Sequence, residues 1–321
     1  MVYSQNSGYL QTIDTLTEIS SKIIEQKFYT IKNIPDFIDI EIGRGGFAEK
    51  IMNWVTYDVA GDFETGNYGN NIDFERTASV DTLIDNKIFH RQKWKKSVTY
   101  NLTDEEQENI TKIINLIEAK ETARKRNFDL GLQKTIFLGS DINPNITGLL
   151  NNNEVNVNTT LITKPLSSMT EIEFNNFIQL FLNLFFENSD NTTMPNTFVL
   201  PTSDYNGLSS QMSPSFPIKT KLQVLQEALS QVVAGYGVMD FKILPVAYAN
   251  ASKNSSGLNI YALYNKNEDT LIYDLPINYT STGFNTPNNF DFQNIAYAMY
   301  GSVNVLRPKE MMYFTSPATQ N

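Results

Sequence analysis

The sequence predicts an α+β fold with three extended parts, namely an N-terminal arm, a projecting loop and a long helix. Three observations lead to this prediction. Of the 321 residues, 41% are hydrophobic and 12% aromatic, which supports a packed core and argues against disorder. One long stretch shows continuous helical periodicity. After residue 140, shorter helical segments occur together with strand-like runs.

Residues 1–42 are expected to form an arm that closes no core of its own. Polar residues separate the apolar ones throughout this segment. The residues that could form a loose helical stripe are Ile13, Leu16, Ile23 and Ile24. Pro35 predicts extended backbone around it, because proline lacks an amide hydrogen and restricts the preceding residue. Such an arm tends to lie on another surface.

A glycine-rich turn at residues 43–46 is expected to lead into a helix over residues 47–57. Four apolar residues recur there at helical spacing, and they are Phe47, Ile51, Trp54 and Val55. A glycine-rich turn before a helix can hold phosphate. Here no Lys-Ser/Thr pair follows and no strand precedes, so we interpret the segment as a backbone turn.

Residues 61–100 predict a long, projecting two-stranded loop, because glycine and asparagine turn formers are followed by short β-type segments. Basic residues interleaved with aromatic residues fill its second half, and they are Lys87, Phe89, His90, Arg91, Lys93, Trp94, Lys95 and Lys96. This pattern occurs in nucleic-acid binding. It also suits an interface with an acidic surface, such as another copy of this acidic chain, and we favour that second interpretation.

Residues 103–137 give the clearest helical signal. Thr103 and Glu106 form a capping box, and acidic residues fill the first turn, where the helix dipole favours them. The apolar stripe that follows consists of Ile110, Ile113, Ile114 and Ile117. Gly139 is the expected end of the helix.

The remaining residues, 140–321, predict an α+β lobe. A second capping box at Thr170 and Glu173 opens a helix, and a further helix is expected to end at Gly235. Strand-like runs cover residues 196–200, 241–247, 258–264, 270–275, 296–306 and 311–314.

No catalytic residue, cofactor or metal site is expected. The chain has no cysteine, which excludes disulfides, thiolate metal sites and a cysteine nucleophile. Its single histidine, His90, excludes a multi-histidine metal site and would have to support a Ser-His-Asp triad alone. Paired carboxylates such as Glu171 and Glu173 are two residues apart on a helix and diverge. These features argue against an enzyme.

Charge and hydropathy restrict the partners. The net charge is −10, and residues 140–321 hold 14 acidic and 8 basic residues. A chain of this kind is a poor general nucleic-acid binder. There is no basic run before an apolar block at the N-terminus, and no apolar stretch of about 18 residues, so we expect neither a secretory signal nor a membrane span.

Four segments resemble one known family. They are Gly45-Gly46-Phe47-Ala48-Glu49, Phe137-Leu138-Gly139 with Thr147-Gly148-Leu149-Leu150-Asn151, Asn196-Thr197-Phe198-Val199-Leu200-Pro201, and Val303-Asn304-Val305-Leu306-Arg307-Pro308. Together with the order of arm, loop, helix and lobe, they resemble tailed-bacteriophage major capsid proteins of the Hong Kong 97 type. The resemblance covers nearly the whole chain.

The resemblance implies a Hong Kong 97-type capsid fold. Its parts would be an N-terminal arm (1–42), a peripheral domain (43–139) with extended β-hairpin loop 61–100 and spine helix 103–137, an axial domain (140–292), and a return to the peripheral domain (293–321). The expected inter-subunit contacts are Lys87, His90, Arg91, Lys93, Trp94, Lys95, Lys96, Asn304 and Arg307. Some members of the family crosslink a loop lysine to a neighbour's asparagine, for which Lys87, Lys93 and Asn304 have the right chemistry.

The implied function is that of a major capsid protein which self-assembles into hexamers and pentamers of an icosahedral shell around double-stranded DNA. Expected partners are further copies of the chain, a portal, and scaffold or decoration proteins. Packaged DNA would be contacted weakly and without sequence preference, and no membrane is involved. The protein would assemble in the host cytoplasm and end in the virion.

Three alternatives stay open at this point. An encapsulin-like nanocompartment shell protein would use the same fold to package a cargo enzyme. A small α+β hydrolase is a second alternative, although the single histidine and the absence of cysteine count against it. The third is a carbohydrate- or surface-binding module, which the tyrosine and asparagine content suggests.

Overall fold

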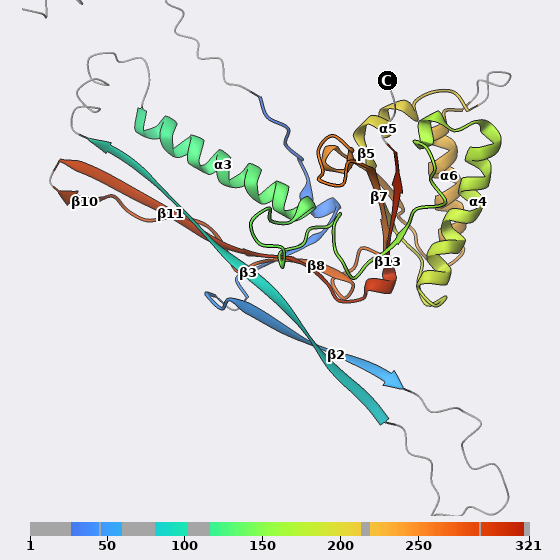
Figure 1. Ribbon diagram of the computed structural model, residues 1–321, viewed down its shortest axis with the longest axis horizontal. Coiled ribbons are helices and arrows are strands. Elements are labelled where there is room, and N and C mark those ends of the chain that lie inside the picture. The colour runs from blue at the N-terminus through green and yellow to red at the C-terminus, as the bar shows by residue number, and fades with distance from the viewer. Residues whose placement is uncertain are drawn as a thin grey trace, which may run out of the picture.

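The computed structural model describes residues 27–44, 46–59, 81–101, 116–212, 219–288 and 290–317. These residues form two bodies and a projecting ribbon (Figure 1). Helix α3 and the long strands β3 and β11 make the first body, from which the β2–β3 ribbon projects. Helices α4 and α6 and the strands beside them make the second body. The observed architecture is therefore α+β, as the sequence predicts.

The first body is built on a sheet with the strand order β10-β11-β3-β2, and β9 also pairs with β11, on the edge opposite β3. Its strands are β2 (Lys50–Val59), β3 (Asp81–Asn101), β9 (Ile277–Ser281), β10 (Asn285–Asn288) and β11 (Asp291–Gly301). Helix α3 (Leu116–Leu138) packs on this sheet, where the ring of Phe128 lies 5.0 Å from that of Trp94.

The expected helix over residues 47–57 is wrong. Residues 50–59 form strand β2, which pairs antiparallel with β3 from Lys50 opposite His90 to Val59 opposite Asp81. The apolar spacing of this short segment suits a helix, but its valine, threonine, tyrosine and isoleucine residues also suit a strand. Pairing with β3, which the local pattern cannot report, decides the outcome. The hairpin therefore begins before residue 61, and residues 60–80 lie outside the described part.

Helix α3 ends where the sequence predicts. Its last residue is Leu138, and Gly139 follows with φ +72°, a conformation that favours glycine. A Cβ on Gly139 would lie 2.3 Å from the Ile146 carbonyl oxygen, so the chain can turn this tightly only at glycine. The capping box at Thr103 and most of the isoleucine stripe lie outside the described residues.

The second body is a five-stranded sheet with helices on one face. The strand order is β4-β13-β7-β5-β6. Its elements are β4 (Asn156–Asn158), β5 (Thr197–Pro201), β6 (Lys242–Val246), β7 (Asn259–Tyr264), β13 (Met311–Ser316), α4 (Glu171–Asn188), α5 (Thr202–Gly207) and α6 (Lys221–Ala234). The capping box of α4 is confirmed, since Thr170 and Glu173 exchange both bonds, and Thr220 with Gln223 forms another at α6.

Two apolar cores lie on opposite faces of this sheet. Phenylalanines of α4, such as Phe181, pack with Phe198 and Phe314 of the sheet in one core. The other core joins the end of α3, through Ile136 and Phe137, to the opposite face. It also contains a small sheet of order β1-β8-β12, whose strands are β1 (Asp39–Ile42), β8 (Leu271–Leu275) and β12 (Val303–Val305).

Short 3-10 turns connect these elements, and they are η1 (Ile34–Asp36), η4 (Leu166–Ser168), η5 (Ala247–Ala249) and η6 (Pro308–Glu310). The first corrects the expectation of extended backbone around Pro35. Proline occupies the first turn of η1, where its fixed φ suits a helical turn and the missing amide hydrogen would find no partner anyway.

The sheets cut across the expected boundary between residues 292 and 293. Strands β8 and β9 precede this boundary, but β8 pairs with β12, which follows it, and β9 pairs with β11, which spans it. Strand β13 follows the boundary and pairs with β7 and β4 of the second body. The division into arm, peripheral domain and axial domain stays a prediction, and strand pairing assigns these three strands differently.

Candidate assembly surfaces

The β2–β3 ribbon is the most extended described part of the molecule. In the described part of the chain, β2 pairs with β3 alone, through residues 81–90 of that strand. From Arg91 to Asn101, β3 pairs with β11 instead. The ribbon therefore projects from the body with no third strand beside it (Figure 1).

Apolar side chains are exposed on this ribbon and at its base. Met52 and Ile88 are 49% and 47% exposed, and Phe47 in the preceding turn is 63% exposed. An isolated two-stranded hairpin is at best marginally stable in water, and it gains stability from a third strand or a packed face. The geometry thus favours a surface that another macromolecule covers.

Three lysines of the predicted contact set lie on the surface of β3. The Nζ of Lys93 pairs with Glu49 at 3.1 Å, and the Nζ of Lys96 donates to Asn127 Oδ1 at 3.0 Å. Lys95 is exposed and points to the same face of the strand as Lys93, because side chains alternate along a strand. All three remain accessible to a partner.

His90 and Trp94 have different surroundings. His90 is half-buried and lies opposite Lys50 in the ribbon. Trp94 faces α3, with its ring 5.0 Å from Phe128 and 6.1 Å from Tyr279. The tryptophan therefore helps to attach α3 to the sheet.

Two residues of the predicted contact set are buried within the subunit. Arg91 is 6% exposed and forms an ion pair with Asp274 of β8. Asn304 is 1% exposed, and its Oδ1 accepts a hydrogen bond from Ser302. Both are engaged inside the chain, so we remove them from the proposed contacts. A buried Asn304 is also inaccessible to a neighbour's lysine, which argues against the crosslink.

Lys87 and Arg307 lie at a hollow of about 590 Å³ between the ribbon and the second body. The Nζ of Lys87 pairs with Glu154 at 2.6 Å and donates to the Val305 carbonyl oxygen at 3.4 Å. Arg307 pairs with Glu310 at 3.3 Å and is half-exposed. Lys87 thus fixes the ribbon to the body outside its base.

The described end of the arm is held by Gln133 of α3, a buried residue. Its Oε1 accepts the backbone N–H of Ile31 at 2.8 Å, and its Nε2 donates to the Tyr29 carbonyl oxygen at 3.3 Å and to the Tyr248 hydroxyl at 3.0 Å. Arg126 lies over the ring of Phe28. One amide side chain thereby bonds to a backbone N–H and a backbone carbonyl of the arm, as a neighbouring strand would.

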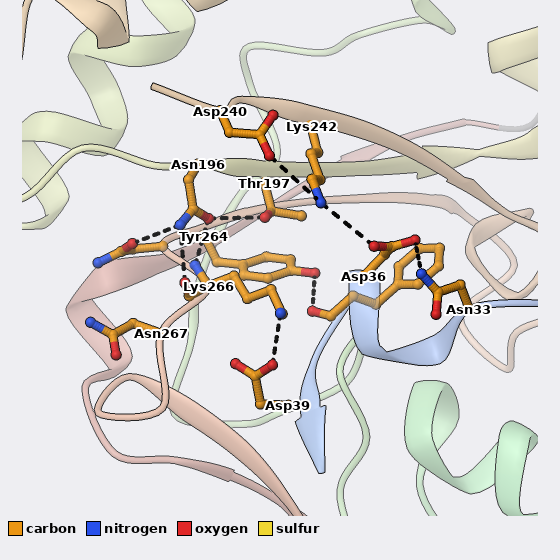
Figure 2. Close-up of polar contacts among 12 residues, drawn as sticks. Asn33, Asp36, Asp39, Asn196, Thr197, Asp240, Lys242, Tyr264, Lys266 and Asn267 are labelled. Carbon is orange, nitrogen blue, oxygen red and sulfur yellow. Dashed lines mark hydrogen bonds and ion pairs between the residues drawn. The ribbon is translucent and has the colours of Figure 1, made fainter. Parts of the chain in front are cut away.

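A polar cluster next fastens the arm to the second body (Figure 2). Asp36 pairs with Lys242 at 3.5 Å and Asp39 with Lys266 at 2.7 Å. Between these pairs, the buried hydroxyl of Tyr264 donates to the Phe37 carbonyl oxygen at 2.7 Å. Burial raises the pKa of the Tyr264 hydroxyl well above its usual value, so it stays a donor.

A second buried polar group joins loops of the second body. The Asp204 carboxylate accepts the backbone N–H groups of Leu166 and Ser167 and the Tyr261 hydroxyl, at 2.7–2.9 Å. Burial raises the pKa of Tyr261, and the Asp204 charge adds to the effect. Burial lowers the pKa of Lys221, which donates to two backbone carbonyls nearby. These contacts all lie within the subunit, so we interpret this polar group as one that stabilises the fold.

Sequence reasoning did not single out Gln133, Arg124 or Asp274. Arg124 is 4% exposed and binds Asn294, Ser281 and Tyr279 of the sheet under α3. The sequence did contain one indication that Arg124 faces the sheet. It precedes Phe128 by one turn and so lies on the apolar face of the helix. Asp274 had no comparable signal, since its partner is far away in the sequence.

Among the described residues, no group of three or more histidine, cysteine or acidic residues is arranged to hold a metal ion. The described helices also include none long and apolar enough to cross a membrane.

Comparison with solved structures identifies the class of fold. The chain is similar to the capsid of Myoviridae phage XM1 (TM-score 0.75, 14% identity, covering 94% of this chain and 97% of that chain) and to a structure from Mycobacterium phage Ogopogo (TM-score 0.58, 11% identity, covering 95% and 98%). It is less similar to the holo-SrpI encapsulin complex from Synechococcus elongatus (0.52, 10%, 97% and 96%). The fold is thus the Hong Kong 97 type of tailed-phage capsids.

The family follows from the sequence itself. The family model for the major capsid protein matches residues 74–316, which is more than half of the chain. The chain belongs to the major capsid protein family, and it is a structural component of a virion. A comparison with curated protein sequences finds no match.

Proposed function

We propose that copies of this chain assemble into hexamers and pentamers of an icosahedral shell that encloses double-stranded DNA. Membership of the major capsid protein family supports the proposal. The observation that carries it is the ribbon, which presents Met52 and Ile88 to solvent and has no third strand in the described part of the chain. In a shell, a neighbouring copy covers this surface.

The proposed contacts of the ribbon are partly electrostatic. Lys93, Lys95 and Lys96 are exposed on an acidic chain of net charge −10, so an adjacent copy offers complementary charge. One exposed ion pair contributes about 0–1 kcal/mol. A closed shell repeats each contact in every subunit, and weak pairs therefore add up. His90 and Arg307 stay in the proposed contact set for the same reason, as partly accessible basic groups.

The remaining partners are part of the same proposal. A portal and scaffold or decoration proteins would bind the assembled subunits in the host cytoplasm, and packaged DNA would contact the shell weakly and without sequence preference. The role is structural and not enzymatic, and membership of a capsid family supports it.

The test is the assembly state of the purified chain. Light scattering and negative-stain microscopy, across a range of salt concentrations and with the co-expressed neighbouring gene products, should show capsomers or closed shells. A stable monomer under every condition would contradict the proposal.

An encapsulin-like shell is the second candidate, because the fold is also similar to that of the SrpI encapsulin. The contents of the particle distinguish the two candidates. Nuclease-resistant DNA inside particles from infected cells supports a phage capsid, whereas a single co-purifying cargo enzyme and no DNA supports a nanocompartment.

A further inference from the structure

Strand β3 changes its pairing partner at Arg91. Residues 81–90 pair with β2, and the strand from Arg91 to Asn101 pairs with β11. The ribbon leaves the body at this point (Figure 1). Because one continuous strand crosses the junction, backbone pairing alone leaves the ribbon free to twist and bend there. Its direction must be set by side-chain contacts.

The Arg91 side chain connects three segments at this junction. Its Nε and Nη2 bind Asp274 Oδ2 and Oδ1 of β8, at 2.5 and 2.9 Å. The same guanidinium donates to the carbonyl oxygens of Arg44 at 2.9 Å and Ala48 at 3.4 Å, in the turn that leads into β2. Strand β8, the incoming turn and β3 are thereby held by one planar group.

Gly301 leaves the space that this ion pair needs. It lies opposite Arg91 in the β3–β11 pairing. A Cβ on Gly301 would lie 2.9 Å from Asp274 Oδ2 and 3.2 Å from Asp274 Cβ. Any larger residue would push the carboxylate away from its place beside the guanidinium.

The other ion pairs that hold the ribbon are more exposed than Arg91–Asp274. Lys93 and Glu49 have side chains 55% and 76% exposed, and Lys87 and Glu154, which meet beyond the base, have side chains 17% and 50% exposed. Exposed pairs contribute little and are screened by salt. The side chains of Arg91 and Asp274 are each 1% exposed, and a bidentate arginine–carboxylate pair fixes distance and orientation together.

We propose that the buried Arg91–Asp274 pair is a positioning device that fixes the direction of the β2–β3 ribbon relative to the body. The inference rests on the proposed function, because in a shell the direction of the ribbon sets the angle at which adjacent subunits meet. Loosening the pair should therefore change the curvature of the assembly and not only the stability of the subunit.

Two variants loosen the pair while they preserve most of the packing. Arg91→Lys keeps the positive charge but loses the planar fork and the bonds to the two carbonyl groups. Gly301→Ala keeps both charges and displaces the Asp274 carboxylate. The matched control is Arg124→Lys, since Arg124 is an equally buried arginine that binds Asn294 and holds α3 to the sheet away from the ribbon.

The first measurement is hydrogen exchange of the dissociated subunit at residues 50–59 and 81–90. Arg91→Lys and Gly301→Ala should speed exchange in both segments by roughly tenfold or more, because opening at the base requires breaking a weakened buried pair. In Arg124→Lys, the ratio of the exchange rate in these two segments to the exchange rate in the rest of the sheet should stay at its wild-type value. Ribbon exchange at the wild-type rate in both test variants overturns the proposal.

The second measurement is the diameter distribution of assembled particles by electron microscopy. The test variants should give tubes, open sheets or shells of altered diameter, and the control should give wild-type shells in lower yield. Wild-type diameters from both test variants overturn the curvature role. If the wild type itself forms no particles, the proposed function fails, and the exchange experiment still decides whether the pair positions the ribbon. If one test variant does not fold, the other carries the comparison.

Discussion

Single polar side chains on apolar faces hold the extended parts of this subunit in place. Gln133 binds the backbone of the arm, Arg124 binds α3 to its sheet, and Arg91 holds the base of the ribbon. Each is buried and makes several hydrogen bonds, so removing one leaves its partners unsatisfied. The expected cost of one orphaned buried group is about 1–3 kcal/mol.

Glu173 gives a pH-dependent prediction at this scale. Its bonds with Lys164 and then Thr170 lower its pKa from 4.5 to about 2. A carboxyl group with a depressed pKa stabilises the fold above its unfolded pKa, and this contribution is lost as the pH falls from 4.5 toward 2. Glu173→Gln keeps the capping box, as Gln223 does at α6. It should therefore reduce the fall in stability over this pH range.

Denaturant unfolding at a series of pH values tests this expectation. Glu171→Gln removes an acidic residue from the same first turn and serves as the matched control. If Glu173→Gln and wild type lose stability in parallel between pH 4.5 and 2, the contribution of this carboxylate is refuted.

At the scale of elements, one glycine within α3 and one directly after it should respond in opposite directions to substitution by alanine. Gly139→Ala forces a residue with a Cβ into φ +72° and places that Cβ 2.3 Å from the Ile146 carbonyl oxygen. The variant should lose at least about 2 kcal/mol, or fail to fold. Gly131 lies within the helix, and a Cβ added there would meet no atom within 4 Å apart from its chain neighbours and the adjacent helix backbone. Gly131→Ala should therefore gain about 0.5–1 kcal/mol.

Thermal and denaturant unfolding of the two alanine variants measure the difference. Equal effects at the two positions would show that the tight turn after Leu138 is not needed. The pair is informative because the same chemical change is made once inside α3 and once directly after it.

The exposed lysines of β3 give a prediction for assembly. Replacing Lys93, Lys95 and Lys96 by glutamate should block assembly and leave the fold intact, because the three side chains are on the surface. The matched control replaces Lys219, Lys253 and Lys309, which are exposed lysines of the second body, and so changes the net charge equally. Circular dichroism checks the fold and light scattering the assembly. Normal particles from the β3 variant would refute the proposed interface.

At the scale of the whole molecule, net charge bears on the genome. A shell that releases its DNA must not bind it tightly, and a net charge of −10 opposes tight binding through repulsion that salt screens beyond about 8 Å. The isolated subunit should therefore bind DNA weakly and without sequence preference. A fluorescence anisotropy titration at roughly 150 mM salt measures this, and sub-micromolar binding would be tighter than ordinary non-specific contact. Such binding would assign Lys93, Lys95 and Lys96 to a nucleic-acid surface instead.

The sequence by itself determined the features whose causes are local. The capping box of α4 lies within four residues, and the end of α3 depends on one glycine. Strand-like runs after residue 140 fall on β5, β6, β7, β8 and β13, where apolar and β-branched residues cluster. The absence of cysteine and the single histidine are likewise properties of the composition.

Only the tertiary structure decided the features that depend on distant partners. Residues 50–59 became a strand because β3 lies beside them, and β13 joined the second body because β7 offers it an edge. Arg91 looked like one more basic residue of an exposed loop, yet Asp274, a partner 183 residues away, draws it into the interior. Long-range pairing supplies the free energy in each case, and a local pattern carries no record of it.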